Sequence, residues 1–218
     1  MKKTTLAILV VASLALPTLA SAAPFRQGPY IGGFVGVTVP EKTDATSYDG
    51  TSVFNDRISF EPGVNVGGVL GYDFGGVRFE GEVSYKDIRF DTINDNAGGR
   101  FKVVDGSVDT TAFMANVFFD LRNQSPITPY IGGGVGFAAL HLNDTYGYQT
   151  NGTGELSYLS DDDVVFAYQV GAGLEVPLNR LLSLDLAYRY FGTTEASFLN
   201  TEMELKTHNA TVGLRLKF

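Results

Sequence analysis

The feature of this sequence that most restricts its fold is an alternation of apolar and polar residues at every second position. Between His208 and Phe218, every second residue is apolar or aromatic, and the residues between them are polar, small or charged. Segments 77–85, 164–176 and 181–191 alternate in the same way. Successive side chains of a strand point to opposite faces, so this period predicts β-strands with one apolar face. Helical periodicity is absent beyond the N-terminal segment, and we predict an all-β chain.

Eight segments of this kind can be delimited along the chain. They are 28–39, 62–74, 77–90, 107–122, 128–142, 163–178, 181–192 and 206–218. Short turns are expected at Gly75-Gly76, at 123–126 and at Asn179-Arg180, because their glycine, asparagine, serine and proline residues are typical of hairpins. The other connections are long and polar, and we expect loops at 40–61, 91–106, 143–162 and 193–205.

The two faces of these strands favour a membrane barrel over a soluble one. A soluble barrel encloses its apolar face, whereas an outer-membrane barrel turns that face to the lipid. The polar faces here carry a few nearly charge-matched residues among many glycines and alanines, as a narrow lumen requires. Strands of about 12 residues tilted by about 40° span roughly 30 Å, the thickness of a bilayer core. We therefore predict an eight-stranded antiparallel up-and-down transmembrane β-barrel with short periplasmic turns and long extracellular loops.

The phrase PYIGG occurs twice, at 29–33 and at 129–133, where the first and fifth predicted strands begin. Alternation places Ile31 and Ile131 outward and the glycine that follows each of them inward. Inward glycines leave room for bulky side chains from other strands of a narrow barrel. A phosphate-binding glycine loop is the alternative, but neither copy has the GxGxxG spacing or a following helix.

The N-terminus has the pattern of an export signal. Lys2 and Lys3 precede an apolar run of about a dozen residues, and Ala20-Ser21-Ala22 forms a small-residue cleavage site. The run is short for a membrane-spanning helix. We predict a signal peptide at 1–22 and one barrel domain at 23–218.

Composition restricts the functions that remain. The chain has 16 basic and 24 acidic residues, a net charge of −8, and no basic patch, which argues against nucleic-acid binding. It contains no cysteine, so it has neither disulfides nor a cysteine metal site. The acidic run Asp161–Asp163 lacks the spacing of a calcium loop. We expect neither a cofactor nor a bound metal.

Charged residues on the inner faces are predicted to form a network inside the barrel. Its members are Arg78, Glu80, Glu82, Asp120, Glu175, Asp185, Arg189, Arg215 and Lys217. An eight-stranded barrel is just wide enough for side chains, so we expect this network to plug the lumen. The alternative is a gate in which Glu80, Glu82 and Arg215 exchange partners and admit ions.

Several segments resemble a known family: TPYIGGGVGF, FAYQVGAGLEVPL, LSLDLAYRYF and THNATVGLRLKF. They are similar to the small eight-stranded outer-membrane β-barrels, which include the OmpA transmembrane domain, OmpX, opacity proteins and surface antigens called porin family proteins. The resemblance implies a location in the Gram-negative outer membrane, contact with its lipid and lipopolysaccharide, and biogenesis through periplasmic chaperones and the barrel-assembly machinery. The terminal Phe218, preceded at alternating positions by Val212, Leu214 and Leu216, resembles the assembly signal of such proteins.

Family members share a wall and differ in their loops, so the resemblance implies less about activity. We expect a structural or surface-exposed protein that serves envelope integrity or surface recognition through acidic, tyrosine-rich loops such as 143–162. A narrow channel for ions or small solutes is the alternative. A lipid-modifying enzyme is a third possibility, since His141 and His208 lie near the outer ends of strands. Neither histidine has a His-x-Ser pattern beside it, and we expect no enzyme.

Overall fold

The computed structural model describes residues 27–49, 52–95, 100–122, 125, 127–150, 155–158, 160–198 and 201–218. The predicted signal peptide at 1–22 lies outside these residues, so it stays a prediction, as does the domain boundary that follows it. Most of the predicted turn at 123–126 is also outside them. Among the described residues, no helix is long and apolar enough to cross a membrane.

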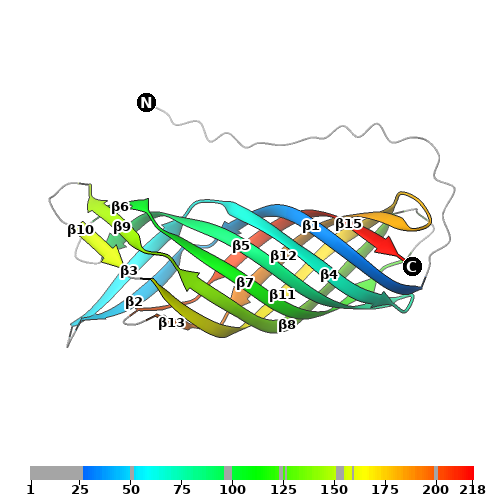
Figure 1. Ribbon diagram of the computed structural model, residues 1–218, viewed down its shortest axis with the longest axis horizontal. Coiled ribbons are helices and arrows are strands. Elements are labelled where there is room, and N and C mark those ends of the chain that lie inside the picture. The colour runs from blue at the N-terminus through cyan, green and yellow to red at the C-terminus, as the bar shows by residue number, and fades with distance from the viewer. Residues whose placement is uncertain are drawn as a thin grey trace, which may run out of the picture.

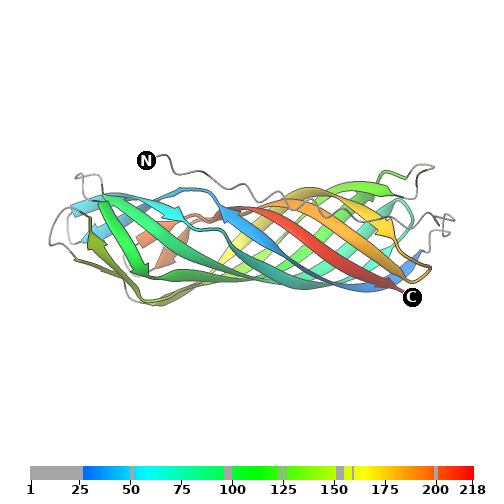
Figure 2. The ribbon, with the colours of Figure 1, turned by 90° about the horizontal axis from the view of Figure 1, so that it is seen from above.

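Eight antiparallel strands close into a barrel and cross the molecule obliquely (Figures 1 and 2). They are β1 (Gly28–Pro40), β4 (Gly63–Asp73), β5 (Val77–Asp95), β7 (Ser107–Asp120), β8 (Thr128–Leu142), β11 (Asp161–Pro177), β12 (Leu182–Thr193) and β15 (Lys206–Lys217). Each of them pairs with the next, and β15 returns to pair with β1, where Gly33 lies opposite Leu214. The predicted eight-stranded up-and-down barrel is therefore confirmed. The largest difference is in β5, which continues to Asp95 instead of ending at residue 90.

Two short turns have the local chemistry that the sequence predicted. At Gly75-Gly76, Gly75 has a φ of 111° and donates its backbone N–H to Asp73 Oδ1 at 2.7 Å. A residue with a Cβ rarely adopts this φ, so glycine suits the position. At Asn179-Arg180, the Asn179 side-chain oxygen accepts the N–H groups of Leu181 and Leu182 at 2.8 and 2.9 Å.

The long connections differ from the loops that the sequence predicted, because much of each is paired as strand. They contain β2 (Thr43–Asp49), β3 (Ser52–Phe60), β6 (Arg100–Asp105), β9 (Thr145–Gln149), β10 (Glu155–Tyr158), β13 (Ala196–Phe198) and β14 (Thr201–Met203). β3 and β6 pair with the C-terminal part of β5, between Phe90 and Asp95. β9 pairs with β6, and β14 pairs with β2. These strands extend the wall at the end opposite the C-terminus (Figure 1). They are short and mostly polar, so their alternation was too weak to detect, and pairing with existing strand edges orders them.

The outward side of the eight strands carries an uncharged band. On β1 the band runs from residue 29 to 39, and Val35 at its middle is 63% exposed. Outward positions 64–72, 77–85, 111–121, 129–139, 164–176, 182–190 and 208–218 continue it without an Asp, Glu, Lys or Arg. Charged outward residues begin just beyond it, at Asp87, Asp109 and Asp162. About ten residues per strand suffice to cross the bilayer, so this band faces the lipid.

Both PYIGG copies serve the packing of a narrow wall. Gly32 and Gly132 face inward, as predicted. A Cβ on Gly132 would lie 2.2 Å from the carbonyl oxygen of Val117 on the adjacent strand, and one on Gly32 would lie 2.9 Å from that of Leu214. Larger residues at these positions would push neighbouring strands apart.

Because the uncharged band faces the lipid, the cost of placing a charge on β1 should depend on its depth in the membrane. We expect Val35→Arg, at the middle of the band, to lower the free energy of unfolding by about 2–4 kcal/mol. Val39→Arg is the control in the same strand and should cost about 0–1 kcal/mol, because the side chain reaches the interface. Urea unfolding in lipid vesicles, followed by far-UV circular dichroism, measures both. Equal losses at the two depths would contradict a lipid-facing band.

Candidate functional site inside and around the barrel

Arg215 on β15 is the centre of a cluster of charged side chains in the lumen. The cluster lies in the half of the barrel that is nearer the short turns, which we call the inner half. Its guanidinium lies 2.8 Å from Glu175 Oε2 and 2.6 Å from Asp185 Oδ2. Glu80 Oε1, on β5, is 3.7 Å away. All four side chains are buried or nearly so, and charges removed from water are tolerated only when paired in this way.

Three further cations, Lys217, Arg78 and Arg122, complete this cluster. Lys217 lies 2.6 Å from Glu175 Oε1 and 3.3 Å from Asp73 Oδ2. Arg78 donates to Asp120 Oδ1 at 2.9 Å and lies 3.3 Å from Glu80. Asp73 is shared, because Arg122 also donates to it at 3.1 Å. The cluster thus joins strands that are distant in sequence.

The two remaining charged residues of the predicted network, Arg189 and Glu82, form an ion pair that lies further from the short turns. Arg189 on β12 donates to Glu82 on β5 at 2.6 Å. Four strand positions separate β5 from β12 in either direction around the barrel, so this pair crosses the full lumen. Glu82 also accepts hydrogen bonds from Asn116 at 2.9 Å and Gln169 at 3.0 Å. The prediction omitted both amides because they carry no charge, although their inward positions in the alternation could have shown them.

The tyrosines of the two PYIGG copies occupy equivalent places in the cluster. Tyr30 donates to Glu80 Oε1 at 2.6 Å, and Tyr130 donates to Asp185 Oδ1 at 2.7 Å. Each ring lies over a glycine of the next strand, since a Cβ on Gly71 or Gly173 would come within 2.4 Å of it. An arginine covers each ring: Arg215 is 5.0 Å from the Tyr30 centroid, and Arg78 is 4.5 Å from that of Tyr130. The repeated phrase therefore builds the same tyrosine–carboxylate–arginine contact twice.

The outer half of the interior is apolar, which the prediction of a charged lumen did not include. Its buried side chains come from the barrel strands and from the extension. They include Ile58, Ile88, Phe90, Val103, Val108, Leu140, Leu142, Phe191, Met203 and Leu205. Lys86 lies at the boundary, with its ammonium 3.2 Å from Ser84 Oγ and 4.0 Å from the centroid of the Phe191 ring. The interior therefore has a charged inner layer and an apolar outer layer.

The two histidines lie outward at separate places, beyond or at the edge of the uncharged band. His208 Nδ1 is 2.6 Å from the Tyr188 hydroxyl, and its Nε2 is 2.9 Å from Glu41 Oε1. His141 Nδ1 is 2.5 Å from Asp162 Oδ1. The hydrogen bond that the His141 ring donates to the Asp162 carboxylate raises the pKa of His141 above its ordinary value of 6.5.

Neighbouring residues of the acidic run Asp161–Asp163 point to opposite faces of β11. Asp162 contacts His141 on the outside, whereas Asp163 accepts the backbone N–H of Ser197 at 2.8 Å. Within the part of the chain that the structure describes, no group of three or more His, Cys, Asp or Glu residues is arranged to hold a metal ion. The residues of the expected assembly signal all face outward on β15 or at its end: Val212, Leu214, Leu216 and Phe218.

The pairing of His141 makes a pH-dependent prediction. Its pKa is raised in the folded protein, so its contribution to stability is fully present below pH 6.5 and is lost as the pH rises through the folded pKa. An NMR titration of the imidazole should give a midpoint above 6.5. Asp162→Asn should move the midpoint down, and an unchanged midpoint would contradict the assignment.

Solved structures share this fold. Outer membrane protein OprG from Pseudomonas aeruginosa matches with a TM-score of 0.58 and 13% identity, over 88% of this chain and 97% of OprG. Neisserial surface protein A matches with a TM-score of 0.54 and 17% identity, also over 88% of this chain and 97% of that chain. At these identities the likeness extends to the fold alone.

Relatives are also found by sequence. The chain is 27% identical to outer membrane protein PagN of Salmonella typhimurium over 215 residues, 87% of this chain and 84% of PagN. It is 27% identical to an outer membrane protein of Gluconacetobacter diazotrophicus over 201 residues, 85% of this chain and 52% of the relative.

The family described as outer membrane protein beta-barrel domain matches residues 6–218. This match covers nearly the whole chain and agrees with the closed barrel and its uncharged outward band. The chain therefore belongs to the outer membrane protein beta-barrel domain family and is a protein of the Gram-negative outer membrane.

Proposed function

We propose that this protein is a non-conducting outer-membrane barrel with a structural and surface-exposed role, whose lumen is closed by its own side chains. The observation that carries the proposal is the filling of the interior by two successive layers, one charged and one apolar. A solute would have to pass both layers to cross the membrane through the barrel.

The charged layer supports a plug because its contacts cross the lumen. Arg189 and Glu82 join opposite walls at 2.6 Å, and Arg215 reaches three carboxylates from two sides. The space beside Arg189, Glu80 and Phe34 amounts to about 20 Å³. A water molecule occupies roughly 30 Å³ in the liquid and needs about 10–15 Å³ of free volume, so this space holds about one water. The alternative of a gate requires Glu80, Glu82 and Arg215 to exchange partners.

The apolar layer supports the same conclusion independently. Ile88, Val108 and Leu140 are at most 1% exposed, and Phe191 and Leu205 pack in the same cluster. An ion that enters an apolar constriction loses its hydration without gaining polar partners. Even a rearranged charge cluster would therefore leave the outer half closed.

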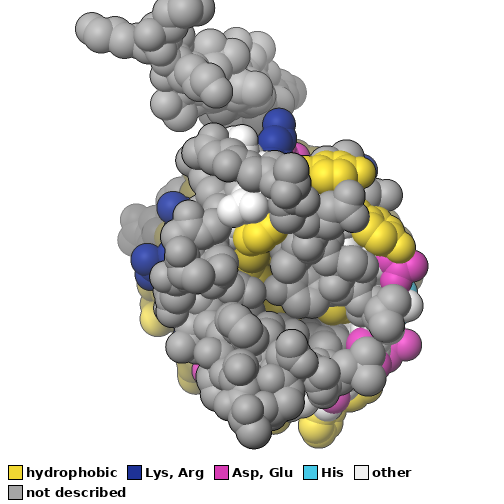
Figure 3. All heavy atoms as spheres, turned by 90° about the vertical axis from the view of Figure 1, so that its left-hand side faces the viewer, with side chains coloured by type: hydrophobic (Ala, Val, Ile, Leu, Met, Phe, Trp, Pro, Cys, Tyr) yellow, Lys and Arg dark blue, Asp and Glu magenta, His cyan; other side chains and the backbone are white. Residues whose placement is uncertain are grey.

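The outer end supports a role at the cell surface. Tyr146 and Tyr148 on β9 are 52% and 58% exposed, and exposed tyrosines are effective contact residues. In the end view of Figure 3, described basic side chains lie on one flank and at the top, and acidic ones gather on the opposite flank. We assign surface recognition and envelope integrity to this end and to the wall. The outward strand that ends at Phe218 is proposed to be read by the assembly machinery.

We further propose that the protein is not a lipid-modifying enzyme. The hydroxyl beside His208 belongs to Tyr188, whose phenol is fixed by the same imidazole that contacts Glu41. His141 contacts a carboxylate. These arrangements serve hydrogen bonding at the interface, and acyl transfer calls for a more nucleophilic group beside the base. Lipid A acylation should be the same with the wild type and with His208→Ala, and a difference would restore the enzyme alternative.

Closure of the lumen predicts the electrical behaviour of the barrel. We expect the purified protein in planar bilayers to show no large, steady open level, because both layers block hydrated ions. Single-channel recording at several voltages measures this, with a known open porin as the positive control. A reproducible open level would contradict the plug and favour the channel alternative.

The ion pair between Arg189 and Glu82, which crosses the lumen, predicts a large loss of stability when one partner is removed. Arg189→Met leaves Glu82 buried without its cation and should cost about 3–5 kcal/mol of unfolding free energy. Arg180→Met, in an exposed turn, is the control and should lie within about 0.5 kcal/mol of the wild type. The double variant Arg189→Met with Glu82→Met should lose less than Arg189→Met alone. Urea unfolding measures all three, and equal stability of the two single variants would contradict the proposal.

A further inference from the structure

We propose that the outer end of the barrel opens at one seam, between β11 and β13, and that the carboxylate of Asp163 is the latch that holds this seam closed. In the open form, β13 and its partner β14 move away from β11 and expose the apolar layer to the outside. The charged layer lies deeper and stays in place. Opening at this seam therefore leaves the lumen closed to solutes.

The seam begins where the ladder between β11 and β12 ends. The last pair of that ladder is Ala167 opposite Thr193, and just beyond it the N–H of Thr194 donates to the carbonyl oxygen of Phe166 at 2.9 Å. β11 continues outward as far as Asp161, and β13 lies beside this part of it. Among the described residues, β13 pairs with β14 but forms no ladder with β11. Two described strand edges therefore face each other without a backbone ladder.

The Asp163 carboxylate takes the place of the missing ladder. Continuation of the β11–β12 register beyond its last pair places Asp163 opposite Ser197. Oδ2 accepts the backbone N–H of Ser197 at 2.8 Å, and Oδ1 accepts the N–H of Val164 at 2.7 Å. Backbone groups alternate between the two edges of a strand, so the N–H of Val164 points to the same edge as the carbonyl of Phe166. One side chain thus satisfies a donor on each side of the seam.

The strands beyond the seam have little other support. β14 pairs with β2 at Thr201 and Glu202, whereas β1 pairs with β15 from Tyr30 to Pro40. Parts of a protein with few backbone hydrogen bonds open at a lower free energy than its long ladders. The loss of one contact should therefore affect opening most at β13 and β14.

The base of the moving strands is fixed by two hydrogen bonds. The N–H of Thr193 donates to the carbonyl oxygen of Leu205 at 3.0 Å, and the N–H of Leu205 donates to Thr193 Oγ1 at 3.1 Å. Beyond this base, Ala196 and Met203 lie opposite each other in the β13–β14 ladder and are buried in the apolar cluster. Movement about the base exposes these two side chains together with the edge of β11.

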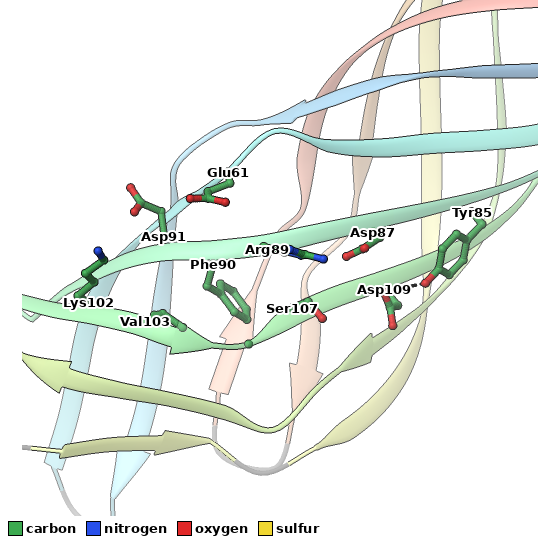
Figure 4. Close-up of a pocket in the computed structure, with 11 residues that line it drawn as sticks. Glu61, Tyr85, Asp87, Arg89, Phe90, Asp91, Lys102, Val103, Ser107 and Asp109 are labelled. Atoms are coloured by element: carbon green, nitrogen blue, oxygen red, sulfur yellow. Dashed lines mark hydrogen bonds between the residues drawn. The ribbon is translucent and has the colours of Figure 1, made fainter. Parts of the chain in front are cut away.

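A hollow beside β5 shows how the wall changes strand neighbours without such a seam (Figure 4). The hollow has a volume of about 530 Å³ and lies where β5 passes from β7 to β6. Backbone hydrogen bonds cross this change: Phe90 donates to the carbonyl oxygen of Gly106 at 3.1 Å, and Glu61 donates to that of Arg89 at 2.9 Å. At the hollow the backbone itself bridges the change, whereas at the seam a side chain does.

Hydrogen–deuterium exchange of the folded full-length protein in phospholipid nanodiscs, followed by mass spectrometry, tests the latch. Asp163→Ala removes both acceptor oxygens and should speed exchange at β13 and β14 by about tenfold or more, because hydrogen bonds to charged groups are the stronger ones. Exchange in β1 and β15 should not change. Asp163→Asn keeps one oxygen and should give an intermediate rate. Asp162→Ala removes the same charge from the other face of β11 and should exchange like the wild type.

Thiol labelling measures the exposure of the apolar layer directly. The chain contains no cysteine, so Met203→Cys provides a single thiol on β14. A water-soluble maleimide should label this thiol faster when Asp163→Ala is also present. Met114→Cys is the control, because Met114 lies opposite Glu82 at the depth of the charged layer. Its labelling should stay slow in both backgrounds.

Two results would overturn the proposal: equal exchange of β13 and β14 in Asp163→Ala and the wild type, or equal acceleration by Asp163→Ala and Asp162→Ala. Heat-modifiable gel mobility shows whether each variant is folded. If Asp163→Ala does not fold, the comparison of Asp163→Asn with Asp162→Asn makes the same test. A steady open level of the wild type in planar bilayers contradicts the plug and leaves the exchange result unaffected, so the two proposals can fail separately.

Discussion

The structure depends on one constraint: inside a bilayer, every backbone N–H and C=O must find its partner within the protein. The pairing of β15 with β1 meets it, because it leaves no strand of the barrel with a free edge. Closure then fixes which residues face the lipid, since a slip of one residue would turn every side chain to the opposite side. The uncharged band outside and the charged cluster inside are two consequences of the same register.

Closure with eight strands also makes the interior narrow, so side chains must fill it. Glycines of the wall provide the space, as Gly71 and Gly173 do beneath the two repeated tyrosines. The inner layer then has room for arginines that each meet carboxylates from other strands, which offsets the cost of burying charge. The outer layer is apolar, and Lys86 marks the transition. The interior is thus filled by two different kinds of interaction.

Beyond the membrane the constraint is relaxed, and the wall becomes irregular. β5 continues past the band and exchanges its neighbours, so β3 and β6 extend the sheet over the apolar layer. Water and headgroups can satisfy polar groups at this height, which is why charged residues such as Asp87 and Arg89 are found on the outward side. The hollow lined by these residues lies where the pairing of β5 changes.

The sequence by itself determined the eight strands, their orientation and the two short turns at Gly75-Gly76 and Asn179-Arg180, because a period of two and turn chemistry are local properties of the chain. The set of inward charges that it predicted lacks Asp73, Arg122 and Lys86, which the structure places in or beside the cluster. The sequence did not determine which inward charges meet. That Arg189 contacts Glu82 across the lumen, while Arg215 gathers three carboxylates, depends on the stagger of all eight strands. The short strands β2, β3, β6, β9 and β10 were also beyond it, since their alternation is weak and they are ordered by pairing with strand edges already in place. The division into charged and apolar layers, and the hollow beside β5, were decided by the tertiary structure alone, because they depend on depth along the barrel and on changes of strand neighbour.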